Sequence, residues 1–337
     1  MVAGLFLALA ASVLCLLPQQ TSPGISKQKP AAGPPPAISS HTAGEITVPF
    51  EYFKHHIYVT LSIDGKPGFI FMLDSGANRN VLNLQASRQL GTKQHSLKQE
   101  KNIGFGDALI YVASEENVEA AIDSIQVAHV MSVMDLNRFQ QHFSHQTDGI
   151  LGYPFFQQFV IKLDFQRKLL TLLPADGYIY RGPGVRVALK PSKNFVVMPV
   201  TVGTASYVFN KIDVAVDTGS NLTLMLYDPY VQPLKLDYSL IHAQPAKGFG
   251  LNGYYPFALG TIELLRIGYA EARNVPVAYL DKDQEPHANR HFPGAIGNGI
   301  LQSFQAVIFD VPQRRIIFEL EPLQWQSGVA RTYVAPR

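Results

Sequence analysis

Two short stretches of this sequence place a carboxylate, a hydroxyl and a glycine directly after three apolar residues. They are FMLDSG, which contains Asp74, and VAVDTG, which contains Asp217. Two carboxylates brought together cannot easily both ionise, so one stays charged while the other holds a proton. Such a pair offers a base and an acid side by side, and a water held between them can attack a peptide carbonyl. The two residues therefore predict peptide hydrolysis without a metal or a covalent intermediate.

The residues around each Asp fit this chemistry. A glycine lets backbone amides approach a carboxylate closely, and the two hydroxyls can tie the turns together. The apolar residues before each Asp are typical of a buried strand that holds its turn rigidly. The residues expected to support the active-site turns are Ser75, Gly76, Ala77, Thr218, Gly219 and Ser220.

The chain repeats this arrangement in its two halves. An apolar pair followed by glycine comes at nearly the same spacing after each Asp, as ILG at 150–152 and AIG at 295–297. A GFG triplet lies between in both halves, at 104–106 and 248–250. A single Asp-Ser-Gly is usually a plain turn. Three ordered landmarks at matched spacing instead indicate two related halves.

Strand-like alternation dominates both halves, and helices are expected to be few and short. Gly and Pro number 26 and 23 among 337 residues, and charged residues make up only 16%. This composition favours a β-rich protein with many turns over a helical bundle. A short helix is expected at 83–91, where Gly91 suits the C-terminal end. Residues 227–234 are a candidate for a single helical turn, and 153–159 and 302–304 are candidates for the start of a further helix.

Together these motifs resemble the pepsin-like and retropepsin-like aspartic proteases over almost all of residues 46–320. The stretch that begins at Asp148 is most similar to bacterial two-lobed members. Ala77 resembles the retroviral enzymes, whereas Ser220 resembles the pepsins. The resemblance implies an all-β fold of two similar β-barrel-like lobes related by pseudo-two-fold symmetry. It also implies a cleft between the lobes and one catalytic residue from each, Asp74 and Asp217.

The same resemblance implies a hairpin flap over the cleft, which in pepsins carries a tyrosine. The glycine-rich stretch 102–111 is expected to be this flap, with Phe105 at its tip and Tyr111 as the weaker candidate for that tyrosine. The stretch 247–255 is expected to form a second flap, as in a retroviral dimer. The candidate flap or substrate-binding residues are Gly104, Phe105, Gly106, Tyr111, Gly248, Phe249 and Gly250.

Composition shifts divide the chain into segments. Residues 1–24 begin with an uncharged apolar run that is short for a membrane span but long enough for a signal peptide, so a signal peptide and an N-terminal anchor both stay open. Either one predicts an extracytoplasmic protein, periplasmic or secreted, with an anchor adding a membrane tether. The remaining segments are a Pro-rich linker (25–45), an N-terminal lobe (46–176), an inter-lobe connection (177–184), a C-terminal lobe (185–322) and a tail (323–337).

Charge and cysteine content exclude several functions. The formal net charge of +2 gives no electrostatic reason to expect nucleic acid as a partner. The single cysteine, Cys15, lies in the leader, so no disulfide, thiol nucleophile or cysteine metal site is expected in the lobes. We expect no cofactor and no metal. Because one chain supplies both Asp residues, we expect a monomer.

The sequence thus predicts an aspartic endopeptidase that acts on peptide or protein substrates. The alternative is a catalytically inactive peptide-binding protein of the same fold. A structural β-sandwich with chance Asp turns is a third hypothesis, against which the matched spacings argue. Because Ala77 stands where pepsins place a hydroxyl beside the carboxylate, the pair should protonate more easily. Cleavage is then expected to peak at weakly acidic pH.

Overall fold

The structure is a computed structural model, and it describes residues 12–13, 44–91, 98–100, 104–106, 108–203, 209–227, 243–280, 292–320 and 333–334. The expected signal peptide or anchor, the linker and the tail lie outside these residues except for short pieces. Within the described ranges, no helix is long and apolar enough to cross a membrane. The described residues are 57% strand and 10% helix, which confirms the predicted all-β class.

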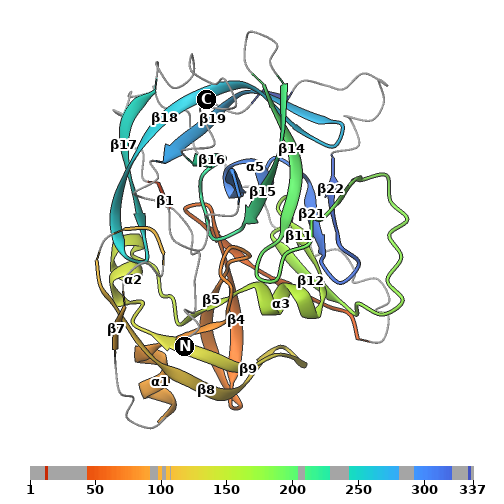
Figure 1. Cartoon of the computed structure of the whole chain (residues 1–337). Helices are drawn as coiled ribbons and strands as arrows, with labels where there is room; N and C mark the ends of the chain where they lie inside the picture. Colours follow the sequence, from red (N-terminus) through yellow and green to blue (C-terminus); the bar gives the residue numbers. More distant parts are fainter. Residues whose placement is uncertain are drawn as a thin grey trace, which may run out of the picture.

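The N-terminal lobe is a closed six-stranded barrel (Figure 1). Its strands follow the order β4-β5-β10-β6-β9-β8, and pairing of β4 with β8 closes the ring. The short strands β3 and β7 extend the sheet at its edges. The strands of this lobe are β3 (Glu51–Phe53), β4 (His56–Ile63), β5 (Lys66–Leu73), β6 (Val81–Asn83), β7 (Lys98–Glu100), β8 (Ile110–Ile122), β9 (Ile125–Met134) and β10 (Gly149–Leu151).

The C-terminal lobe is a second barrel with the same strand order. Its ring runs β14-β15-β20-β16-β19-β18, and β18 pairs with both β14 and β19 to close it. The expected pair of similar lobes is therefore confirmed. The strands are β14 (Val197–Gly203), β15 (Phe209–Asp217), β16 (Leu224–Tyr227), β17 (Gln244–Gly250), β18 (Gly253–Ile267), β19 (Ala270–Leu280) and β20 (Gly294–Gly297), with β1 (Ser12–Val13) and β23 (Tyr333–Val334) at the edges.

A third sheet of six strands joins the two halves of the chain, and the sequence did not predict it. Its order is β13-β22-β21-β11-β12-β2, and the halves meet where β11 pairs antiparallel with β21. Pairing between segments so far apart leaves no local pattern in the sequence. The strands are β2 (Ile46–Pro49), β11 (Val160–Asp164), β12 (Leu169–Leu173), β13 (Val185–Ala188), β21 (Ala306–Asp310) and β22 (Arg315–Glu319).

The described helices are short, as predicted. Helix α1 (Leu84–Leu90) begins at the cap Asn83, whose side chain accepts a hydrogen bond from the Gln85 amide, and ends at Gly91 in the left-handed conformation. Helix α3 (Tyr153–Gln158) follows the ILG element, and α5 (Asn298–Leu301) follows AIG.

Helix α2 (Asn137–Phe143) was missed from the sequence. Its first residue has no side-chain cap, but Asp135 Oδ1 accepts a hydrogen bond from the Asn137 amide (3.0 Å). Phe139 and Phe143 are both buried one helical turn apart. This i, i+4 spacing is the signal that would have predicted the helix.

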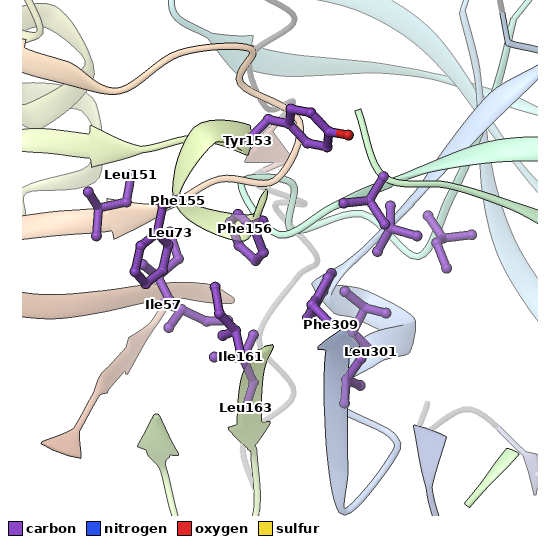
Figure 2. Packing of buried hydrophobic residues seen from close by; sticks show 14 of the residues in the cluster. Ile57, Leu73, Leu151, Tyr153, Phe155, Phe156, Ile161, Leu163, Leu301 and Phe309 are labelled. Carbon is purple, nitrogen blue, oxygen red and sulfur yellow. The ribbon is translucent and has the colours of Figure 1, made fainter. Parts of the chain in front are cut away.

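The largest hydrophobic core runs continuously from one lobe to the other (Figure 2). Phe156 on α3 and Phe309 on β21 are completely buried, and their ring centroids lie 5.0 Å apart at 63°. They come from different halves of the chain, so their contact fastens the N-terminal lobe to the sheet that joins the halves.

We predict that Phe156→Ala destabilises the whole molecule by about 3–5 kcal/mol, the usual cost of removing a buried phenyl ring. The free energy of unfolding, measured by urea denaturation, checks this value. Val130→Ala is the control, because Val130 is 45% exposed and its truncation should change little. A loss below about 1 kcal/mol in Phe156→Ala would contradict the importance of this contact.

Candidate active site

Each predicted Asp lies at the end of a buried strand. Asp74 directly follows β5, and its amide donates a hydrogen bond to the carbonyl of Leu151 on the parallel strand β10 (2.9 Å). Asp217 ends β15 and is the register partner of Gly297 on the parallel strand β20. The equivalent strands of the two lobes therefore deliver the two carboxylates to equivalent positions.

Four hydrogen bonds lock the two Asp turns to each other. The Ser75 amide donates to Thr218 Oγ1 (2.9 Å), and the Thr218 amide donates to Ser75 Oγ (3.0 Å). Each hydroxyl in turn donates to a strand of the opposite lobe, Ser75 to the Val216 carbonyl (2.6 Å) and Thr218 to the Leu73 carbonyl (3.0 Å). The hydroxyls thus tie the turns together reciprocally, in the manner that the sequence suggested.

The two carboxyl groups lie against each other between these locked turns. Asp74 Oδ1 accepts a hydrogen bond from the Gly76 amide (2.9 Å), and Asp217 Oδ1 accepts one from the Gly219 amide (3.0 Å). A Cβ atom on Gly76 would lie 2.6 Å from Asp217 Oδ1, and one on Gly219 would collide with the Asp74 carboxylate. Only glycine therefore allows the two carboxyl groups to approach.

Burial and mutual proximity raise the pKa values of both carboxyl groups. Burial raises the pKa of Asp74 well above its usual range, and the charge and hydrogen bond of Asp217 raise it further. Burial also raises the pKa of Asp217 to about 6, although hydrogen bonds from Asp74 and from the amides of Gly219 and Ser220 oppose the rise. The two carboxyls therefore titrate together, as a buried pair that shares one proton.

The glycines of the two repeated apolar elements pack directly beneath the Asp turns. A Cβ atom on Gly152 would lie 2.7 Å from the Ala77 carbonyl, and one on Gly297 would lie 2.7 Å from the Ser220 carbonyl. The amide of the next residue donates to these same carbonyls, Tyr153 to Ala77 (2.7 Å) and Asn298 to Ser220 (2.8 Å). This close backbone contact explains why each repeat has a glycine at this position.

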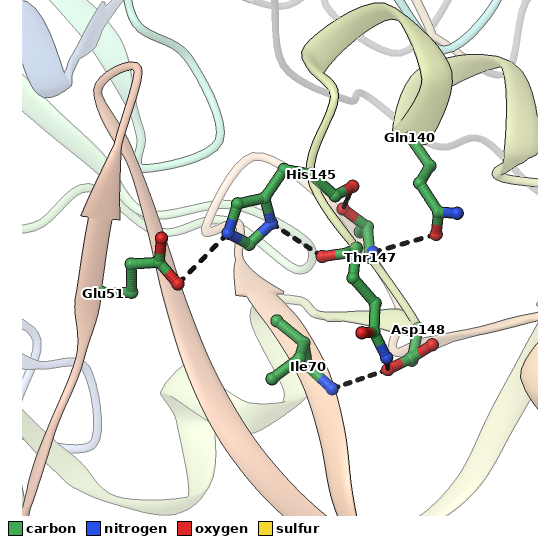
Figure 3. A network of polar contacts seen from close by, with 7 residues as sticks. Glu51, Ile70, Gln140, His145, Thr147 and Asp148 are labelled. Carbon is green, nitrogen blue, oxygen red and sulfur yellow. Dashed lines mark hydrogen bonds and ion pairs between the residues drawn. The ribbon is translucent and has the colours of Figure 1, made fainter.

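A polar network sets the register of β10 and so places Gly152 (Figure 3). Asp148 exchanges two hydrogen bonds with Ile70, through its amide to the Ile70 carbonyl (2.7 Å) and its Oδ2 from the Ile70 amide (2.8 Å). Gln146 Nε2 also donates to Asp148 Oδ2 (2.7 Å), and His145 Nε2 lies 3.2 Å from Glu51 Oε2. Asp148 thereby fixes where β10 begins beside β5.

His56 and Asn298 support the second Asp turn, and sequence reasoning did not identify either role. His56 is completely buried and hydrogen-bonded to the backbone of Gly219; burial dominates and lowers its pKa to about 3. It is therefore neutral at the pH values where the pair titrates. Asn298 Nδ2 donates to the carbonyls of Thr218 (2.6 Å) and His55 (2.7 Å). The contacts of His56 with Gly219 and of Asn298 with His55 cross between the halves, and Asn298 lies 80 positions from Thr218, so no local motif revealed them.

The two predicted flap segments meet each other over the site. Phe105 is 1% exposed and packs on Tyr255 of the other hairpin, with ring centroids 4.9 Å apart. Phe249 stacks on His142 of α2, with ring centroids 3.7 Å apart. Tyr111, by contrast, is 41% exposed and its hydroxyl accepts a hydrogen bond from Gln99 Nε2 (2.8 Å). Its placement gives no support to a role in the cleft.

Tyr255 is a buried tyrosine that the sequence analysis did not single out. Its ring lies over Gly248, its partner across the β17–β18 hairpin, where a Cβ atom would collide with it. No described group hydrogen-bonds its buried hydroxyl. Burial raises the pKa of Tyr255 well above its usual range, and the nearby charges of Tyr227 and Asp217 add to the rise. The C-terminal hairpin thus carries a phenol close to the carboxylate pair.

Comparison with known proteins agrees with this geometry. Residues 59–155, which include Asp74 and the 150–152 element, match a family model described as Aspartyl protease. No curated protein gives a significant match to the chain. Among the described residues, no group of three or more His, Cys, Asp or Glu side chains could hold a metal ion.

We predict that Thr218→Val destabilises the protein by about 1–3 kcal/mol, because the buried Ser75 amide and Leu73 carbonyl each lose a partner. Valine keeps the shape of threonine, so the loss reports the hydrogen bonds rather than packing. Thr218→Ser is the matched control, since it retains the hydroxyl and should stay close to the parent. Denaturant midpoints of the three proteins decide the matter; equal midpoints for the valine and serine variants would contradict the reciprocal lock.

Proposed function

We propose that this chain, a member of the aspartyl proteases of retropepsin or pepsin type, is an endopeptidase in which Asp74 and Asp217 activate water. The observation that carries the proposal is the buried contact of the two carboxyl groups, each held by the amide of its own turn glycine. Aspartic protease function in general is supported by the family match. The assignment of the two residues to catalysis is ours.

We assign the shared proton to Asp74, since burial and the charge of Asp217 both raise the pKa of Asp74, and this assignment divides the reaction between the two residues. The Asp217 carboxylate takes a proton from the water as the water oxygen bonds to the peptide carbonyl carbon. Asp74 gives its proton to the carbonyl oxygen, which yields a neutral tetrahedral intermediate. Asp217 then gives the proton that it took from water to the amide nitrogen, and the carbon–nitrogen bond breaks as Asp74 takes back a proton from a hydroxyl of the intermediate, which leaves the amine and the carboxylic acid. The hydrogen bonds of Ser75 and Thr218 hold both carboxyls in place through these steps.

A silent peptide-binding protein of the same fold is the second candidate. It would use the same hairpins to hold an extended peptide but would not cleave it. Retention of both carboxyl groups favours the enzyme, because binding alone gives no reason to bury an ionisable pair at a cost in stability.

Partners and location follow from the same proposal. The ligand is a peptide or a protein in extended form, and one chain suffices because it supplies both Asp residues. We propose that the protein acts outside the cytoplasm, as a periplasmic or secreted enzyme, on the basis of the apolar run in residues 1–24. A membrane tether through this segment belongs to the same proposal.

Replacing either carboxyl should abolish cleavage, because neither can serve as base and acid alone. We expect Asp74→Asn and Asp217→Asn each to lower kcat/KM on an unfolded protein substrate, reduced casein, by about 10²–10⁴-fold. Asp176→Asn is the control, since Asp176 is exposed and its loss should change nothing. Near-full activity in either dyad variant would refute the mechanism. A wild type that binds a statine-containing peptide but cleaves nothing would favour the silent alternative.

The dependence of kcat/KM on pH should reflect the raised pKa values of the two carboxyl groups. Because Asp217 must be charged to act as the base, kcat/KM should fall as the pH drops below about 6. Ala77→Ser adds a donor beside Asp74, which stabilises the ionised pair and should move both limbs of the profile down by roughly 0.5–1 pH unit. Ala86→Ser, at a buried alanine of α1, controls for the added hydroxyl. Unchanged limbs in a stably folded Ala77→Ser protein would show that this position does not set the titration.

A further inference from the structure

Asn252 joins the tips of the two hairpins with all of its hydrogen-bonding groups. Its side-chain Oδ1 accepts from the Gly104 amide (2.8 Å), and its Nδ2 donates to the Ala108 carbonyl. Its backbone amide donates to the Phe105 carbonyl (2.9 Å), and its carbonyl accepts from the Ala108 amide (2.7 Å). Asn252 belongs to the C-terminal lobe and its three partners to the N-terminal lobe. We call this set of contacts the hairpin clasp.

The backbone shape of both tips is fitted to the clasp. Gly106 has a φ of +103°, and a Cβ atom there would collide with the Asn252 carbonyl. A Cβ atom on Gly250 would lie 2.6 Å from the Phe105 carbonyl. Asn252 itself is 1% exposed. Any other residue at these glycines would hold the tips apart, so the closed arrangement is specified by several residues at once.

The clasp holds Phe105 inside the opposite lobe. Phe105 comes from the N-terminal hairpin, yet every other buried member of its apolar cluster belongs to the C-terminal lobe. These members are Ala215, Leu222, Met225, Tyr227, Tyr255, Phe257, Ala278, Leu280 and Ala295. The ring of Phe105 therefore fills a space that the C-terminal lobe lines.

This space lies next to the carboxylate pair. Ala215 precedes Asp217 by two residues on β15, and Leu222 follows the same turn. Tyr255 contacts the Phe105 ring, and it lies close enough to Asp217 for the charge of that residue to raise the pKa of Tyr255. A peptide whose scissile bond sits on the pair must place a neighbouring side chain on this side of Asp217. Phe105 and that side chain cannot occupy the space together.

The C-terminal hairpin is braced on its other side. His142 of α2 stacks on Phe249 with an interplanar angle of 4°, and its Nδ1 lies 3.4 Å from the Tyr254 hydroxyl. The N-terminal tip has no comparable contact with its own lobe among the described side chains of residues 104–106. Opening is therefore expected to release the N-terminal tip from a hairpin that stays in place.

We propose that Phe105 is an internal blocking group, which the clasp of Asn252 holds in the space required by a large apolar substrate side chain. This inference rests on the proposed peptidase function of the same site. The unliganded protein is then self-blocked. A peptide with a large apolar side chain beside the scissile bond enters by displacing Phe105, and loss of the clasp speeds that entry.

The first test follows the clasp without any need for catalysis. Trp325, the only tryptophan, is replaced by Phe, and Phe105→Trp then supplies a single reporter. We expect acrylamide to quench this reporter weakly, and Asn252→Ala to raise the quenching constant at least threefold. Asn194→Ala, at an exposed asparagine, should leave it unchanged. Strong quenching in the parent, or no change with Asn252→Ala, would overturn the proposal. If Phe105→Trp fails to fold, hydrogen exchange of the Gly104 and Ala108 amides answers the same question in the otherwise native chain. Asn252→Ala should speed this exchange. Unchanged exchange rates would overturn the proposal.

The second test measures entry of a ligand. Association of a statine-containing peptide with a phenylalanine-like side chain is followed by stopped flow. We expect Asn252→Ala and Phe105→Ala each to raise the association rate constant severalfold, with Asn194→Ala as before. Equal or slower association in both variants would overturn the blocking role. If the peptide binds none of the proteins, the proposed peptidase function fails, and the quenching result still decides whether the clasp holds Phe105.

Discussion

The contact between two buried carboxyl groups is the constraint on which the rest of this structure depends. Each carboxyl is removed from water, which disfavours its charged form, and each repels the charge of the other. The pair persists because it shares a proton and because amides of Gly76 and Gly219 stabilise the remaining charge. Neither lobe can provide this environment alone, so the lobes have to be held in one fixed relation.

Three sets of contacts maintain that relation at different distances from the carboxyls. The reciprocal bonds of Ser75 and Thr218 lock the turns themselves. The apolar core around the edge-to-face pair Phe156 and Phe309, with the sheet that joins the halves, fastens the lobes below the site. The hairpin clasp at Asn252 connects them above it. The first two sets belong to the folded core, whereas the entry of a peptide that we propose requires the third set to open.

Sequence reasoning performed well wherever the signal was local or repeated. The Asp turns, the glycines beneath them and helix α1 each depend on residues close together in the chain, and the repeat doubled the evidence for the turns and their glycines. It missed helix α2, whose cap comes from Asp135 one residue before the expected position. It offered Tyr111 as a weaker candidate for the flap tyrosine and did not single out Tyr255, the buried phenol that lies near the carboxyls.

The sequence by itself determined that two similar all-β lobes would each bring one Asp to a shared site, because strand periodicity and turn chemistry are written in neighbouring residues. Only the tertiary structure decided that the two carboxyls are buried together, that His56 supports the Gly219 turn, and that Asn252 closes the hairpins over Phe105. These features depend on distances between residues far apart in the chain. Such distances are set by strand register and core packing, and no local pattern of residue types records them.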